Sequence, residues 1–306
     1  MGRPGRTDAH IHILREGIRT RASSSDDLRW YDKLRRASGI THALVVGYEG
    51  EPRFAGNNAE ILAISKQHLW AHPLAFLDVR AEHEFEQLAA IRSRGFDGFA
   101  LYLPETGPSI DSWSTRNVAE LAAGGGIVSV NGTPAAIGRV HRTLAEMTEG
   151  SVLISHLGGA GNTAANATND DSERLLAPVL ALSEYPHVFI KISGLYAIDP
   201  RFPHYGARSA FEAIHNSFDA RRLVWGSDFS PVLDYVTDDE MTAIPEWMAS
   251  EFSPAELEDV LCHNLIRILS PSRREFDITS GSRLPDAARS NTGERCGTIA
   301  KGNPQP

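Results

Sequence analysis

Short apolar runs recur along the chain at fairly even intervals, and most are followed by a segment with apolar residues at helical spacing. The helical pattern is clear where five apolar residues fall within 175–182, on one side of a helix with 3.6 residues per turn. The strand-like runs are 7–13, 41–48, 72–79, 96–104, 126–133, 151–157, 187–195 and 222–230. The intervening helical segments include 26–38, 57–69, 82–93, 135–148, 172–185 and 207–218.

Alternating strands and helices predict an α/β protein with parallel strands joined by right-handed crossovers. Eight such units favour a (β/α)8 TIM barrel, built as one domain over residues 1–270. An open doubly wound sheet is the alternative, but no glycine-rich phosphate-binding sequence follows the first strand. Residues 271–306 are polar and lack apolar periodicity, so we predict a disordered tail there.

Helix starts are also visible in the sequence. Asp26 and Ser172 precede apolar periodic segments and are candidate N-caps. After the last strand, 237–269 reads as helical, and Ser253 followed by Pro254 is typical of a helix start. The segment 158–171 is rich in glycine and asparagine, and we expect a mobile loop or lid over the mouth of the barrel.

Polar side chains gather near the C-terminal ends of the predicted strands. Parallel strands are normally apolar throughout, and buried ionisable groups are costly unless they are paired or used. Active sites of β/α barrels lie at that end of the strands. We therefore predict one site formed by residues from most of the strands: His10, His12, Tyr48, Tyr102, Asn131, His156, Lys191, Ser193 and Asp228.

The first strand carries a distinctive pattern, with Asp8, His10 and His12 at alternate positions of 7–13. In a regular strand all three would point to one face, which places two imidazoles in one space with a carboxylate behind them. Such a pair can share a metal ion, hold an anionic substrate or exchange protons. The alternative is two ordinary histidines on a solvated strand.

Composition narrows the choice of partner. The formal charge is −9, so no basic surplus is available for nucleic acid or an anionic membrane. Two cysteines, Cys262 and Cys296, are too few for a disulfide framework or a cysteine-rich metal site. No signal-like or membrane-spanning apolar run occurs. We expect a cytoplasmic enzyme with a small-molecule substrate, and homo-oligomerisation stays open.

Five motifs occur in an order that resembles the amidohydrolase superfamily: T-D-A-H-I-H at 7–12, L-I-S-H-L-G-G at 153–159, K-I-S-G-L at 191–195, V-W-G-S-D-F-S at 224–230 and H-N-L-I-R-I-L at 263–269. More narrowly, they resemble the amidohydrolase-related branch of TIM-barrel lactonases and metal-dependent decarboxylases. The resemblance covers residues 7–270. It implies the barrel fold but does not select the reaction.

The resemblance also implies roles for individual residues. His10 and His12 match a pair that contacts a metal or, in metal-free lactonases, the substrate. Asp228 matches an aspartate that is a general base, a metal ligand or both, and His156 matches a histidine that polarises the scissile carbonyl. Lys191 lies in the K-x-S-G motif, as a substrate contact or as part of a structural ion pair beneath the site.

Two departures from the family pattern bear on the cofactor and on anion binding. Asn131 stands where metal-binding relatives have a histidine, and an amide oxygen is a poor zinc ligand. The cofactor prediction therefore stays open between none and one divalent metal such as zinc, held by His10, His12 and Asp228. Ala100 stands where relatives often have a basic residue, and the candidate replacements are Arg15, Arg201 and Arg208.

These residues predict hydrolysis of a small organic-acid ester or lactone. Asp228 would activate water, while His156 and the first-strand histidines polarise the carbonyl. Substrate contacts are expected from Asn131, Tyr48, Tyr102, Arg15 and Lys191. A metal-dependent decarboxylase of an aromatic or unsaturated acid is the second hypothesis. A catalytically inactive binding barrel is the third.

Overall fold

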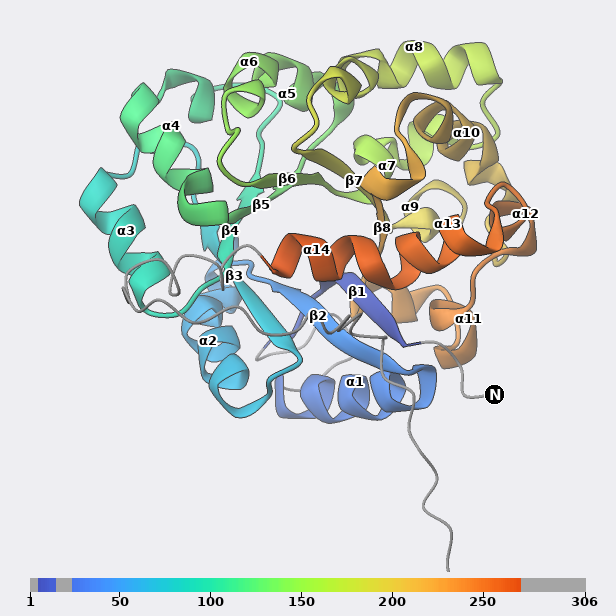
Figure 1. Ribbon diagram of the computed structural model, residues 1–306, viewed down its shortest axis with the longest axis horizontal. Coiled ribbons are helices and arrows are strands. Elements are labelled where there is room, and N and C mark those ends of the chain that lie inside the picture. Colours follow the sequence, from blue (N-terminus) through green and yellow to red (C-terminus); the bar gives the residue numbers. More distant parts are fainter. Residues whose placement is uncertain (1–4, 15–23, 271–306) are drawn as a thin grey trace, which may run out of the picture.

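Eight parallel strands lie side by side in the computed structural model, which describes residues 5–14 and 24–270 (Figure 1). Their spatial order follows the sequence. A parallel bridge between Ile11 and Phe229 brings the last strand back to the first, so the sheet forms a nearly closed barrel, as the sequence predicted. The strands are β1 (Arg6–Ile11), β2 (Ile40–Val46), β3 (Ala71–Leu77), β4 (Gly98–Tyr102), β5 (Ile127–Asn131), β6 (Ser151–Ile154), β7 (Val188–Ile192) and β8 (Leu223–Trp225).

Helices surround this barrel, and each predicted helical segment overlaps at least one of them (Figure 1). The predicted helix over 135–148 is divided into two short helices, and one helix between β4 and β5 was not predicted. The helices are α1 (Ser24–Ser38), α2 (Asn57–Gln67), α3 (Phe85–Ser93), α4 (Thr115–Ala122), α5 (Pro134–Arg139), α6 (His141–Ala145), α7 (His156–Gly159), α8 (Asn169–Leu180), α9 (Leu195–Ile198), α10 (Arg208–Ser217), α11 (Asp238–Thr242), α12 (Glu246–Ala249), α13 (Pro254–Glu258) and α14 (Asn264–Leu269).

Of the three predicted helix starts, the structure confirms one and shows that two are wrong. Ser253 caps α13, accepting a hydrogen bond from the Glu256 backbone in a full capping box. Asp26 and Ser172 lie inside α1 and α8 instead. The cap of α8 is Thr168, whose hydroxyl accepts from the Asp171 backbone. A side-chain oxygen four residues upstream satisfies the same unpaired donors, so α8 begins earlier than the apolar period indicated.

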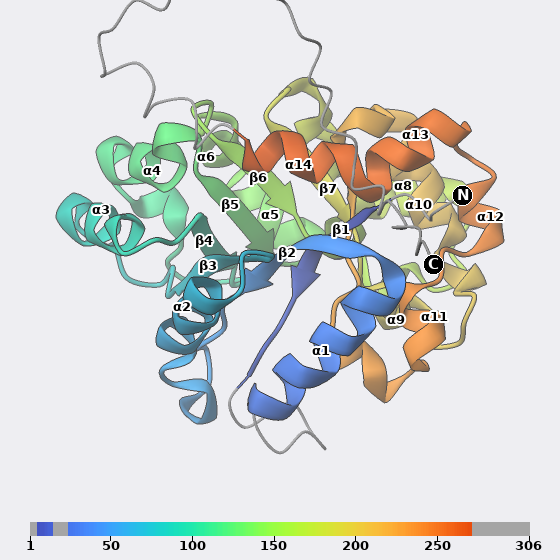
Figure 2. The ribbon, with the colours of Figure 1, turned by 60° about the horizontal axis from the view of Figure 1, so that its bottom comes forward.

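The interior of the barrel is filled by an inner apolar cluster that includes Ala9, Leu44, Leu74 and Leu153, all fully buried. Leu265 of α14 belongs to the same cluster. Helix α14 therefore closes the end of the barrel opposite the arrowhead of β1 (Figure 2). The C-terminal ends of the strands, where active sites of β/α barrels lie, are at the other end of the barrel.

No helix in the described part of the chain is long and apolar enough to cross a membrane. The segment 158–171, predicted as a mobile loop or lid, contains the last two residues of α7, a 3-10 turn at Gly161–Ala164 and the start of α8. Part of the expected loop therefore consists of short helical turns. The tail predicted at 271–306 lies outside the described residues.

Candidate active site

A break in the register of β1 determines to which face of the sheet the side chains of this strand point. Asp8 pairs with Ala43 and Ile11 with Val45, so three steps along β1 match two along β2, as in a β-bulge. Asp8 accepts a hydrogen bond from Tyr31 of α1 outside the barrel (3.0 Å). The prediction that Asp8, His10 and His12 share one face is therefore wrong, because the extra residue reverses the alternation after Asp8.

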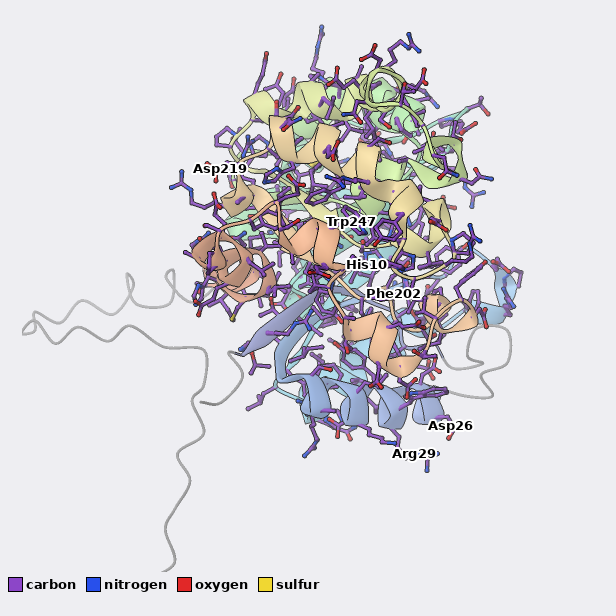
Figure 3. All side chains as sticks on the ribbon, turned by 90° about the vertical axis from the view of Figure 1, so that its right-hand side faces the viewer. His10, Asp26, Arg29, Phe202, Asp219 and Trp247 are labelled. Carbon is purple, nitrogen blue, oxygen red and sulfur yellow. The ribbon has the colours of Figure 1, made fainter. Side chains whose placement is uncertain are left out.

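His10 and His12 do share one space, together with Asp228. Their Nε2 atoms are 3.1 Å apart and lie 3.7 and 3.9 Å from Asp228 Oδ1. His12 Nδ1 is 2.9 Å from the Val46 carbonyl oxygen, which orients the ring. His10 is fully buried and lies near the centre of the molecule (Figure 3). Burial lowers the pKa of both histidines, so each imidazole is neutral at pH 7.

His156 reaches the same carboxylate from the other side. It opens α7 just after β6, and its Nδ1 is 3.7 Å from Asp228 Oδ2. The Ser193 hydroxyl contacts both its backbone N–H and its Nδ1, at 3.2 and 3.1 Å. Burial lowers the pKa of His156 as well, although Asp228 opposes that shift. Asp228 thus lies among three neutral imidazoles from β1 and β6.

The backbone at two of these residues is unusual. Asp228 and His156 have φ angles of 58° and 55°, in the left-handed region that side chains other than glycine rarely adopt. Such conformations cost free energy and concentrate at functional sites. Asp228 N donates to His10 O (2.9 Å), which holds the strained turn against β1.

Asp8 supports this turn from behind. Ser227 donates to it twice, through its backbone N–H (2.9 Å) and its hydroxyl (2.6 Å), and His10 N donates at 3.2 Å. Burial raises the pKa of the Asp8 carboxyl to about 6 despite these donors. Asp8 therefore joins β1 to the residue before Asp228 and is a structural part of the site.

The predicted residues at the ends of β2, β4 and β5 lie next to one another. Tyr48 and Tyr102 are half-buried, and their ring centroids are 4.8 Å apart; Phe76 of β3 completes an aromatic wall, 5.7 and 5.8 Å from them. Burial raises the pKa of Tyr102, and the Asp228 charge adds to this. Asn131 ends β5 beside Tyr102 in register. The wall can accept a flat apolar group.

Two of the three predicted basic residues, Arg201 and Arg208, lie on the surface. Arg208 lies half-exposed on α10 and forms ion pairs with Glu212 (2.7 Å) and Glu251 (3.3 Å), so its guanidinium is already used on the surface. Arg201 is exposed beyond β7. Arg15 lies outside the described residues. The structure therefore gives neither Arg201 nor Arg208 a place at the histidine cluster.

Sequence reasoning missed Tyr196 and Ser155. The Tyr196 hydroxyl on α9 donates to Asp228 Oδ2 at 2.7 Å, and Ser155 Oγ lies 3.4 Å from His10 Nδ1. Tyr196 follows the K-x-S-G motif by two residues, in a four-residue helix too short to show an apolar period. Its role depends on a contact between residues 32 positions apart.

The donor set has the dimensions of a metal site. Zinc bonds of about 2.0–2.1 Å place neighbouring tetrahedral ligands roughly 3.3 Å apart. The distances among His10, His12 and Asp228 are 3.1, 3.7 and 3.9 Å. His10, His156 and Asp228 form a second triad whose ligand atoms lie within 4.8 Å of one another. By distance, either set fits a divalent cation.

Comparison with known proteins identifies the family. The amidohydrolase family model matches residues 7–270. An amidohydrolase from Burkholderia multivorans is 21% identical, in a form with bound HEPES (TM-score 0.71) and one with bound zinc (0.70), each over 87% of this chain and 99% of that one. A probable 2-pyrone-4,6-dicarboxylic acid hydrolase from Acinetobacter baumannii, with citric acid bound, is 18% identical over the same shares (TM-score 0.67). No curated protein matches the sequence. The chain belongs to the amidohydrolase family.

Proposed function

We propose that this protein hydrolyses a small ester or lactone of an organic acid, with Asp228 as general base. The observation that carries the proposal is a single carboxylate whose oxygens lie 3.7–3.9 Å from three neutral imidazoles. Asp228 would take a proton from water as the oxygen attacks the carbonyl carbon; the ester C–O bond then breaks, and the protonated Asp228 returns the proton to the leaving alkoxide. Neutral imidazole N–H groups would stabilise the developing oxyanion without adding charge to the free site.

The aromatic wall and the similar structures support a ring-shaped substrate. Tyr48, Phe76 and Tyr102 offer flat apolar surfaces, and Tyr102 lies close enough to Asp228 for the carboxylate charge to raise its pKa. Two similar structures carry the name of a probable or putative 2-pyrone-4,6-dicarboxylic acid hydrolase, and a 2-pyrone is a cyclic ester. Bound HEPES and citric acid in the relatives fit a site for small organic anions.

A divalent cation is compatible with this assignment. His10, His12 and Asp228 would hold it, with His156 as the other candidate ligand. When bound, such an ion polarises a carbonyl and lowers the pKa of water. The roles of Tyr196 and the aromatic wall would be unchanged, because they position Asp228 and the substrate.

The proposal is tested by assaying the protein against a panel of lactones and of aryl and alkyl esters, with proton release as the measure of hydrolysis. We expect turnover by the wild type and a fall of about 10²–10⁴-fold in Asp228→Asn, because the amide cannot accept a proton from water. Asp170→Asn, an exposed aspartate of α8, is the matched control and should be unchanged. Activity of Asp228→Asn within about tenfold of wild type, roughly 1.4 kcal/mol of barrier, would exclude Asp228 as the base. Carbon dioxide release from an unsaturated acid would identify a decarboxylase instead.

A further inference from the structure

Lys191 is a fully buried amine that the proposed reaction does not use. Its Nζ lies 2.6 Å from Ser129 Oγ and 3.2 Å from His10 Nδ1. Among the described residues no carboxylate lies within 4 Å of it, so the ion pair considered as an alternative is not formed. A lysine in the barrel interior is expensive unless its N–H groups are used. Its contact with His10 therefore calls for an explanation.

The positions of the ring protons on His12 and His10 can be assigned in turn, starting from the Val46 carbonyl oxygen. A carbonyl oxygen only accepts, so His12 Nδ1, 2.9 Å away, carries the proton of the neutral ring. His12 Nε2 is then a lone pair. His10 Nε2 lies 3.1 Å from it, and two lone pairs would repel at that distance, so His10 Nε2 must carry its proton. His10 Nδ1 is left as an acceptor, and it faces the Lys191 Nζ.

We propose that Lys191 is a positioning residue that donates to His10 Nδ1 and so fixes His10 as the Nε2–H tautomer. Lysine has N–H donors in either charge state, so this contact does not depend on its ionisation. The Nε2–H of His10 then points into the space shared with His12 and Asp228. The tautomer follows from the hydrogen-bond distances between neutral rings, whereas its effect on turnover rests on the proposed function.

Two consequences distinguish Lys191 from a passive core residue. His10 enters the reaction with its proton on Nε2, where it donates to His12 Nε2 in the free site and can exchange that acceptor for an oxyanion. The same arrangement opposes a cation, since a ligating histidine offers a lone pair to the metal and donates its other N–H to an acceptor. Here that other nitrogen meets a lysine, with only the Ser155 hydroxyl (3.4 Å) as an alternative partner.

The direct test is the tautomer of His10 in the intact protein. Long-range ¹H–¹⁵N spectra of ¹⁵N-histidine-labelled protein distinguish Nε2–H from Nδ1–H rings, and His10→Gln assigns the signal. We expect Nε2–H in the wild type. A wild-type His10 in the Nδ1–H form overturns the proposal, and this measurement requires no Lys191 variant to fold.

Zinc affinity gives a second readout that is independent of activity. We expect Lys191→Met to bind zinc at least tenfold more tightly than wild type in competition with a chelator, because the donor facing His10 Nδ1 is gone. Lys66→Met, which removes an exposed lysine of α2, is the matched control and should leave zinc affinity unchanged. Ser129→Ala removes the other Lys191 partner and should retain the Nε2–H signal. Equal zinc affinity in folded Lys191→Met and wild type would overturn the proposal.

The kinetic arm separates this inference from the proposed function. With an accepted ester or lactone, Lys191→Met should lose kcat by tenfold or more with little change in KM. If no ester or lactone is turned over, the proposed function fails while the tautomer and zinc measurements still decide the role of Lys191. An unchanged kcat in a folded Lys191→Met variant would show that the lysine does not position His10 for reaction.

Discussion

At the scale of single residues, Asp228 is held by unusually many constraints. Its φ angle of 58° is unfavourable for an aspartate, yet its backbone N–H is bonded to His10 O and its Oδ2 to Tyr196. The two carboxylate oxygens face different partners: Oδ1 faces His10 and His12, and Oδ2 faces His156. This division leaves Oδ1 as the oxygen directed at the first-strand pair, with Oδ2 fixed by Tyr196.

Tyr196→Phe should lower kcat by roughly tenfold, about 1.4 kcal/mol of barrier, while keeping the ring in place. The reason is loss of the 2.7 Å hydrogen bond that orients the carboxylate. Tyr205→Phe, at a tyrosine 65% exposed, is the control. An unchanged kcat in Tyr196→Phe would mean that Tyr196 does not position Asp228.

Asp8 links stability to pH in a direction that its raised pKa sets. Between pH 4 and about 6 the native carboxyl keeps a proton that the unfolded chain has lost, so the stability it contributes is present below pH 4 and is lost as pH rises through about 6. Relative to Asp8→Asn, the wild type should lose about 2 kcal/mol of unfolding free energy from pH 4 to 7. Urea unfolding of both proteins at several pH values measures this. A difference independent of pH would contradict the raised pKa.

At the scale of elements, the site depends on turns that bring strand ends together. Gly194, between β7 and α9, has a φ angle of 66°, and a Cβ there would lie 2.5 Å from His156 Nδ1. The same turn carries Ser193, which holds His156, and leads to Tyr196. The connection after β7 thus fixes both neighbours of Asp228 Oδ2.

Gly194→Ala should displace His156 and reduce kcat/KM at least tenfold, in addition to the strain of about 1–2 kcal/mol for a left-handed alanine. Gly56→Ala separates the two effects, because Gly56 has a φ angle of 89° but no atom within 4 Å of the place that an alanine methyl group would take. That variant should lose stability only. Kinetics and urea unfolding of both variants make the comparison, and equal activity in the two would show that the approach to His156 is unimportant.

At the scale of the whole molecule, the barrel is closed at one end by α14 and carries its chemistry at the other. Leu265 of α14 packs with the inner apolar cluster, whereas the histidines and Asp228 follow the C-terminal ends of β1, β6 and β8. The fold and donor distances alone are compatible with metal-dependent and metal-free members of the family. Metal content is therefore a property to measure on the intact protein.

We expect the purified protein to hold less than one equivalent of tightly bound transition metal and to keep most of its activity in chelator. Asn131 supplies no nitrogen ligand, and Lys191 opposes a ligating His10. Asn131→His should raise the metal content if the other donors surround one point. Elemental analysis of both proteins decides this. One full zinc in the wild type, with activity lost in chelator and restored by metal, would contradict the expectation.

The order of residues was enough to predict the barrel, its eight strands and the strand ends at which His10, His12, His156 and Asp228 meet. Apolar periodicity indicates which helices and strands form, and polar residues in otherwise apolar strands indicate where the active site lies. Tertiary packing was needed to establish that Asp8 faces α1 and that Lys191 contacts His10, 181 positions away. A bulge and a long-range hydrogen bond depend on how neighbouring strands pair, and the pattern along one strand does not contain that information.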